Sequence, residues 1–271
     1  MFVIFAADRR APLAPTTMTD QTLRARSVSE LVDATFSLYR RDASAYIMVT
    51  AIASVPGLIA QLILLGQQRQ FTLLGSFSFV IVTIVSTVTF ALMSGVVMKV
   101  GSDVYQGGDA DVAGAVRHVR PLVGTLVAVA LMRGILLVLG IFPGMGIGVL
   151  YVLARWFAPE AAVVLEGSSS IQAFSRASAL SEGRRWHIVG ALALGYSIYF
   201  LLAGALGIAI AAVRNDVVSL VIQNLYTIVA YPVVGLLTML VYYDARIRAE
   251  GFDVEHMART LGTSPAGPGQ P

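Results

Sequence analysis

The sequence predicts an all-α fold: a polytopic membrane bundle of six transmembrane helices, built as three repeats of an interfacial amphipathic helix followed by a two-helix unit. Three observations predict this architecture. The chain is 56% hydrophobic and only 13% charged, with a mean hydropathy of +0.76, whereas a soluble domain carries about 25% charged residues. Six segments are apolar enough to cross a bilayer, and an amphipathic pattern precedes each pair of them.

The six spans are identified by their length. A bilayer core of about 30 Å needs about 20 residues of helix, and this requirement is met by residues 44–65, 74–98, 122–142, 145–165, 187–212 and 218–241. Between the third and fourth spans, Phe142–Gly148 holds one proline and three glycines, which favour a sharp turn between helices.

One membrane domain is therefore expected over residues 23–257. Residues 1–22 are expected to be a disordered leader, with Met18 as an alternative start. The Gly/Pro-rich residues 258–271 have no periodicity and are expected to be a disordered tail.

A repeated unit precedes each pair of spans. Ser27-x-x-Glu30 is a capping-box pattern that opens a helix with one apolar stripe. Val104–Arg117 and Val164–Arg176 align with one gap: each has a valine, a two-residue spacer, a glycine, an Asp or Ser N-cap candidate and a closing arginine. These matches predict three copies of one unit. The alternative is that ordinary surface helices precede unrelated spans.

Basic residues are distributed unevenly around the spans. Fifteen Lys and Arg residues fall on the side of the two termini, against Arg69 and Arg214 on the other side, which predicts that both termini are cytoplasmic. A single lysine beside eighteen arginines is typical of a GC-rich bacterium, so we expect the bacterial cytoplasmic (plasma) membrane. The net charge of +3 is scattered and accompanies no nucleic-acid-reading motif, which argues against nucleic acid as a partner.

Charges inside the third and fourth spans mark the candidate site. Arg133 and Arg155 fall near the midpoints of these adjacent antiparallel spans, so they are expected at the same depth, with Glu160 within reach. Tyr151, Arg155 and Pro159 share one helical face. Each arginine costs about 2.5–3.5 kcal/mol at the membrane centre, so neither is expected to face lipid. One carboxylate cannot neutralise two guanidinium groups.

A second acceptor is therefore expected. Backbone carbonyls freed by Pro159, the hydroxyls of Tyr151, Ser86 or Thr87, or a bound anion could supply it. Three interpretations stay open: an internal Arg–Glu clamp, a contact with an anionic headgroup or solute, or misplaced spans. The planar arginine fork suits the phosphate or carboxylate of such a ligand.

Several stretches together resemble a known family. In order, "RARSVSELVDATFSLYRR", "ARWFAPEAAVVLEG", "AFSRASAL", "GRRWHIVG" and "YYDARIRAEGFDVEHM" are similar to the membrane domain of some glycerophosphoryl diester phosphodiesterases and of stand-alone bacterial membrane proteins. The resemblance covers about Leu23 to Met257 and implies a membrane module that works beside lipids or a partner. In the enzymes, catalysis belongs to a separate soluble domain with a His-Arg-Gly start, which has no counterpart here.

The motifs of known chemistry are absent from the sequence. It has no Gly-x-Ser-x-Gly, His-Glu-x-x-His or Walker pattern and no cysteine, so we expect no enzyme activity, no cofactor and no metal. The favoured function is a non-catalytic module, acting as scaffold or partner subunit in envelope or lipid-related processes. The alternatives are a transporter or lipid-handling carrier with an anion site at Arg133 and Arg155, and an intramembrane enzyme. The expected partners are the lipid bilayer with its anionic headgroups, and a membrane protein or a second copy of the chain.

Overall fold

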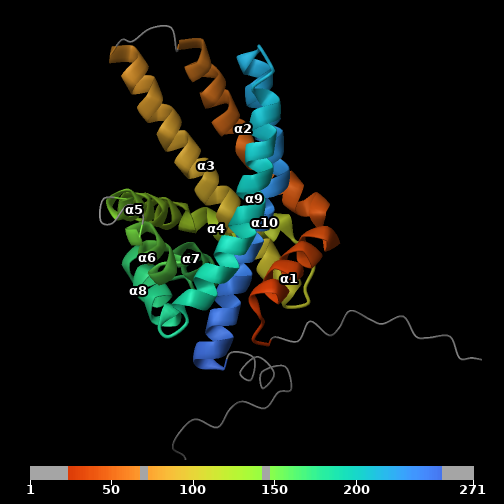
Figure 1. Ribbon diagram of the computed structural model, residues 1–271, viewed down its shortest axis with the longest axis vertical. Helices are drawn as coiled ribbons and strands as arrows, with labels where there is room; N and C mark the ends of the chain where they lie inside the picture. Colours follow the sequence, from red (N-terminus) through yellow and green to blue (C-terminus); the bar gives the residue numbers. More distant parts are fainter. Residues whose placement is uncertain (1–23, 68–72, 142–146, 252–271) are drawn as a thin grey trace, which may run out of the picture.

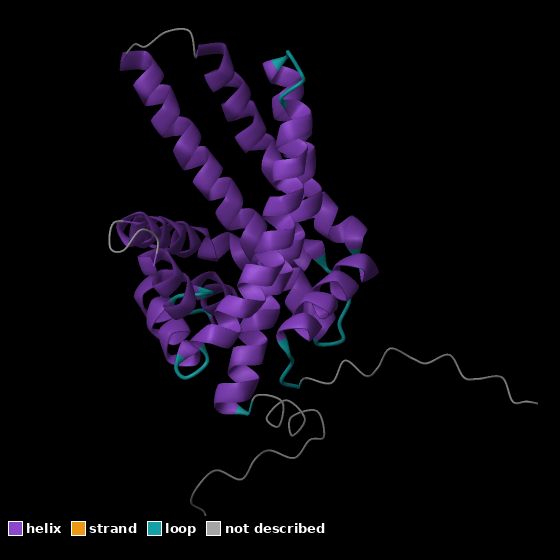
Figure 2. Ribbon diagram, viewed as in Figure 1, coloured by secondary structure: helices purple, strands orange, loops and turns teal. Residues whose placement is uncertain are grey.

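The computed structural model describes residues 24–67, 73–141 and 147–251, and all regular structure in these ranges is helical (Figures 1 and 2). Six segments are long and apolar enough to cross a membrane: Ala43–Gly66, Val80–Tyr105, Val112–Ile141, Ile147–Glu166, Arg185–Ile210 and Asp216–Glu250. The predicted all-α membrane fold is thereby confirmed. The expected leader, the expected tail and most of the Phe142–Gly148 turn lie outside the described residues.

The helices follow one another as three units along the chain. The first unit contains α1 (Val28–Arg41), α2 (Ala43–Gln67) and α3 (Leu73–Tyr105). The second contains α4 (Val112–Val119), the 3₁₀ turn η1 (Arg120–Leu122), α5 (Val123–Ile141), α6 (Ile147–Arg155) and α7 (Pro159–Glu166). The third contains α8 (Ser170–Ser181), α9 (Arg185–Ile210) and α10 (Asp216–Glu250). Each unit therefore has a short helix followed by two apolar segments, as the repeat predicts.

A glycine with positive φ follows the last helix of each unit. These residues are Gly107 (φ +90°), Gly167 (φ +68°) and Gly251 (φ +64°). The left-handed conformation ends a helix and is costly for residues with a Cβ, which explains why glycine stands there. Gly107 and Gly167 are the two glycines that the sequence alignment pairs. Gly251 occupies the equivalent position at the end of the third unit.

The short helices begin with the capping contacts that the sequence predicts. At α1 the Ser27 hydroxyl accepts from the Glu30 N–H at 3.3 Å, and the Glu30 carboxylate accepts from the Ser27 N–H at 2.8 Å. At α4 the Asp111 carboxylate accepts from the Gly114 N–H at 2.8 Å. The apolar stripe of α1 faces the bundle, because its buried side chains pack against α9 and α10.

The Glu30 contacts predict an acid-sensitive start of α1. The hydrogen bond from the Ser27 N–H and the bond from Arg24 lower the pKa of Glu30 from 4.5 to about 2. A carboxylate whose pKa is depressed by folding stabilises the folded state above its unfolded pKa and loses that effect as the pH falls. Hydrogen exchange of the first turn of α1 should therefore accelerate between pH 4.5 and about 2, after correction for intrinsic exchange. A Glu30→Gln variant should lack this step, and an identical profile in both proteins would contradict the prediction.

Helix α10 forms the centre of the molecule. Every residue from Val234 to Ala245 is buried, and the helix contacts α1, α2, α3, α7, α8 and α9. A helix that is buried on all sides must be covered by neighbours, and here the neighbours come from all three units. Figure 1 shows α2, α3, α9 and α10 along the long axis, with the first and last described residues at the same end.

The third and fourth apolar segments differ most from the prediction. Figure 1 shows α5 lying across the long axis, although it has the length of a span. The fourth segment is not one helix, because Trp156–Ala158 are non-helical and separate α6 from α7. Pro159 is the first residue of α7, where its missing N–H costs nothing, and the residue before a proline is disfavoured in the helical conformation. The proline therefore marks the start of a new helix after a break in the fourth predicted span.

Candidate functional site

Arg133 and Glu160 form a largely buried ion pair between α5 and α7. The Arg133 Nη1 donates to both carboxylate oxygens of Glu160, at 3.0 and 2.9 Å. Its Nη2 donates to the carbonyl of Phe157 at 3.2 Å. The two charged side chains are only 15% and 13% exposed. The sequence correctly places Glu160 within reach of an arginine, and the arginine is Arg133.

The break before Pro159 supplies both acceptors. Phe157 precedes the N-cap Ala158, so its carbonyl lies outside the hydrogen-bond ladder of α7 and is available to Arg133. Glu160 lies in the first turn of α7, where the partial positive charge of a helix N-terminus favours a carboxylate. The second acceptor at Arg133 is thus a backbone carbonyl near Pro159. Such a carbonyl is one of the acceptor types that the sequence suggests.

A pocket of about 120 Å³ lies beside this ion pair. Helices α3, α5, α7, α9 and α10 all line it, and its polar lining residues are Ser94, Arg133, Glu160, Tyr196, Tyr231 and Thr238. A second pocket, of about 110 Å³, shares Phe90 with the first. Its polar lining residues are Ser54, Gln61, Ser86, Thr89, Gln223, Asn224 and Thr227. The rings of Phe90 and Tyr231 contact edge to face, with centroids 5.4 Å apart, where the two pockets adjoin.

Arg155 has different partners from Arg133. Its Nη1 donates to the Tyr151 hydroxyl at 2.7 Å, and its Cζ lies 5.4 Å from the centroid of the Trp156 ring. The Tyr151 ring is shared: the Cζ atoms of Arg155 and Arg185 lie 5.9 and 5.7 Å from its centroid. Arg155 is not among the residues that line the pocket beside Glu160.

The prediction that Arg133 and Arg155 lie at the same depth is wrong. Arg155 lies beside Arg185, the first residue of α9, whereas Arg133 shares a pocket with Tyr196, eleven residues further along α9. Eleven residues correspond to about 16 Å of helix. The two arginines therefore contact different levels of α9, and α5 lies across the long axis where an upright span was predicted.

The three hydroxyl groups that were predicted as acceptors lie at different places in the structure. Tyr151 accepts from Arg155, Ser86 lines the pocket on the far side of Phe90, and Thr87 donates to the carbonyl of Thr83 in its own helix. No hydrogen bond joins Ser86 or Thr87 to either arginine within the described ranges. The four predicted residues Arg133, Glu160, Arg155 and Tyr151 thus form two pairs.

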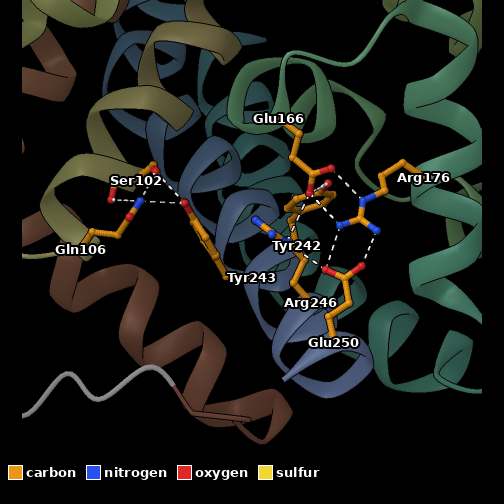
Figure 3. Close-up of polar contacts among 8 residues, drawn as sticks. All are labelled: Ser102, Gln106, Glu166, Arg176, Tyr242, Tyr243, Arg246 and Glu250. Atoms are coloured by element: carbon orange, nitrogen blue, oxygen red, sulfur yellow. Dashed lines mark hydrogen bonds and ion pairs between the residues drawn. The ribbon is translucent and has the colours of Figure 1, made fainter. Parts of the chain in front are cut away.

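A charged network joins the ends of α7 and α10 through Arg176 in the middle of α8 (Figure 3). The Glu166 carboxylate accepts from Arg176 at 2.7 and 3.1 Å and from the Tyr242 hydroxyl at 2.7 Å. Arg176 also pairs with Glu250, and Arg246 lies 3.3 Å from both Glu166 and Glu250. Two carboxylates and two guanidinium groups balance in charge. The two hydrogen-bonded carboxylates raise the pKa of Arg176, which stays charged.

The next residue of α10 reaches the first unit. The Tyr243 hydroxyl lies 2.7 Å from the Ser102 hydroxyl and accepts from the Gln106 amide at 2.9 Å, as Figure 3 shows. Tyr242 and Tyr243 are both buried, with exposures of 0% and 3%. They link the ends of the other two units to α10.

Asp244 completes the run of polar contacts on α10. Its Oδ1 accepts from the Arg26 N–H at 2.7 Å, and its Oδ2 lies 3.1 Å from His187 Nε2 and 2.8 Å from Arg248 Nε. The sequence pairs Asp244 with Arg248 by their i,i+4 spacing but not with Arg26 or His187, which come from distant parts of the chain. The alternating charges after Tyr243 have the pattern of a solvated helix end. Only their partners in the structure show that they form contacts inside the protein.

The described residues include no group of three His, Cys, Asp or Glu side chains able to hold a metal ion. Comparisons with protein families, curated proteins and solved structures found no match to this chain. The site is thus characterised by its geometry: a buried Arg133–Glu160 pair beside a polar pocket, and a separate Arg155–Tyr151–Arg185 cluster. The first can hold helices together or exchange Glu160 for another anion, and the second presents two positive charges around one aromatic ring.

Proposed function

We propose that this chain is a non-catalytic membrane module, acting as scaffold or partner subunit in envelope or lipid-related processes of a bacterial cytoplasmic membrane. The observation that carries the proposal is that the half-buried charges of the bundle are used to join helices to one another. Arg133–Glu160 connects α5 to α7, and Arg176 connects α7 to α10. The sequence resemblance to the membrane domain of glycerophosphoryl diester phosphodiesterases motivates the same proposal. Both termini are proposed to be cytoplasmic, as the distribution of Lys and Arg favours.

Native mass spectrometry of the full chain, extracted from its own membrane under mild conditions, tests this function. A stoichiometric protein partner, or a defined homo-oligomer, is the expected result. The control is the same measurement after a harsher detergent has dissociated the assembly. A monomer that transports a solute by itself after reconstitution would overturn the proposal.

A carrier is the second candidate, and the pocket beside Arg133 favours it. Interrupted helices and buried charges near polar cavities recur at transporter sites. An anionic solute entering this pocket could replace Glu160 at the Arg133 guanidinium. Since Arg155 lies elsewhere, the anion site of the carrier would contain Arg133 without Arg155.

Uptake of anions into proteoliposomes separates the two candidates. A carrier should support uptake that is lost in Arg133→Met/Glu160→Met, which removes both charges of the pair, and retained in Arg117→Gln, since Arg117 has a side chain that is 77% exposed. Equal background leakage in the wild type and both variants would exclude the carrier for the anions tested. Reporter fusions after Gln70 and Asn215, which should both report the external side, check the proposed orientation.

A further inference from the structure

Two arginines surround the Tyr151 ring without a carboxylate partner. The Cζ atoms of Arg155 and Arg185 lie 5.9 and 5.7 Å from the ring centroid, and neither side chain forms an ion pair within the part of the chain that the structure describes. Arg133 and Arg176, by contrast, each pair with a glutamate. Two like charges beside one ring repel each other, so the cluster has an excess of positive charge that an anion would relieve.

The hydrogen-bonding capacity of the cluster is also unfilled. A guanidinium has five N–H donors. The described residues provide one acceptor for Arg155, the Tyr151 hydroxyl at 2.7 Å, and none for Arg185. The Nε atoms of both arginines are buried and lack a partner. Because the Tyr151 oxygen accepts from Arg155, its own O–H remains available to donate. Three side chains can therefore donate to one anion.

The residues around the cluster are of the kinds that concentrate at the level of lipid headgroups. Arg185 is the first residue of the apolar helix α9, and the next residue, Trp186, is 85% exposed. Trp156 contacts both Arg155 and the edge of Tyr151. Tryptophan and tyrosine concentrate at the level of the headgroups, where their rings bridge the apolar core and water. The α9 N-terminus adds a partial positive charge at the same level.

We propose that Arg155, Arg185 and Tyr151 bind the phosphate group of an anionic ligand: the headgroup of an anionic phospholipid, or a free phosphate compound. Arginine is suited to this role because its planar fork matches two phosphate oxygens. The phosphate would neutralise both guanidinium groups and accept the Tyr151 proton. The site lies apart from Arg133 and Glu160, and its occupancy does not depend on whether the chain is a scaffold or a carrier.

Thermal unfolding and native mass spectrometry of the full chain test the site. The lipid probe is a vesicle of equimolar phosphatidylglycerol and phosphatidylcholine, with pure phosphatidylcholine as the reference, and the second probe is inorganic phosphate in detergent. The test variant is Arg155→Gln/Arg185→Gln. Its matched control is Arg40→Gln/Arg117→Gln, which removes the same charge from two exposed positions on α1 and α4.

We compare binding of whichever probe stabilises the wild type. The test variant should bind that probe at least about ten-fold more weakly for each arginine removed, and the control should bind it like the wild type. Tyr151→Phe, which keeps the ring, should weaken binding by a few-fold. Should the double glutamine variant fail to fold, Arg155→Lys/Arg185→Lys keeps the charges and should still weaken binding, because lysine lacks the fork.

The two probes identify the source of the phosphate. Stabilisation by phosphatidylglycerol alone would assign the site to a lipid headgroup, and stabilisation by inorganic phosphate as well would extend it to soluble phosphate compounds. Equal stabilisation of wild type, test variant and control by each probe would overturn the proposal, as would the absence of any stabilisation.

Discussion

Replacing Arg133 with glutamine should reduce the free energy of unfolding by about 3–5 kcal/mol, because it leaves Glu160 buried without its counter-charge. The Glu160 side chain is only 13% exposed, and Arg133 provides both of its hydrogen bonds in the described structure. The Phe157 carbonyl loses its donor as well. Chemical denaturation in a mild detergent measures the loss. Arg117→Gln, which changes an exposed arginine, should stay within about 0.5 kcal/mol of the wild type.

The double variant Arg133→Met/Glu160→Met distinguishes a clamp from a binding site. Removing both charges of a buried pair and filling the space with apolar side chains is often neutral or stabilising. The double variant should therefore recover most of the lost stability. A pure clamp would then keep its partner or oligomeric state, whereas a carrier would fold but stop transporting. Wild-type stability of Arg133→Gln alone would show that the pair contributes little to the fold.

The spans could be predicted because their signal is local. Length and apolar composition define a membrane helix, so the first, second, fifth and sixth segments were found to within a few residues at most ends. The main exception is α10, which continues to Glu250 where the prediction ended the span at 241. Its last turns carry charges that a bilayer would reject, but their partners on α7, α8 and α9 accommodate them.

The candidate site could be predicted only in part, because some of its contacts have no local signal in the sequence. Glu160 was assigned correctly as the acceptor of an intramembrane arginine, because both lie in apolar segments that must pack together. The position of Glu160 relative to Arg155 depends on a break at Trp156–Ala158, for which Pro159 was the only local signal. A proline is compatible with a kink or with a new helix start, and the surrounding packing decides between them.

Arg185 was missed because its role depends on tertiary contact. In the sequence it stands in a basic group before the fifth span, where a solvated position is the ordinary interpretation. In the structure it meets Tyr151, which is 34 residues away in another unit. The adjacent Trp186 was the available signal, since arginine and tryptophan together at the start of a span are typical of the headgroup level.

Asp244→Asn should lower the free energy of unfolding by about 3 kcal/mol, although it changes neither size nor shape. Asp244 is 3% exposed and has three neighbouring donors: the Arg26 N–H, His187 and Arg248. An asparagine amide has one acceptor oxygen in place of two, so its NH₂ group must face at least one of these donors. The buried aspartate ties the chain before α1 and the start of α9 to α10, so its loss should loosen all three together.

Hydrogen exchange gives the prediction a local signature. The amide of Arg26 and the first turns of α1 and α9 should exchange faster in Asp244→Asn than in the wild type, while the α2–α3 pair should change only with global stability. The matched control is Arg40→Gln, since Arg40 is exposed on α1. This variant should stay within about 0.5 kcal/mol of the wild type. If Asp244→Asn cost no more than Arg40→Gln, the three units would be held together by apolar packing, the tyrosine contacts and the Glu166–Arg176–Glu250 network, and the aspartate would be a consequence of that packing.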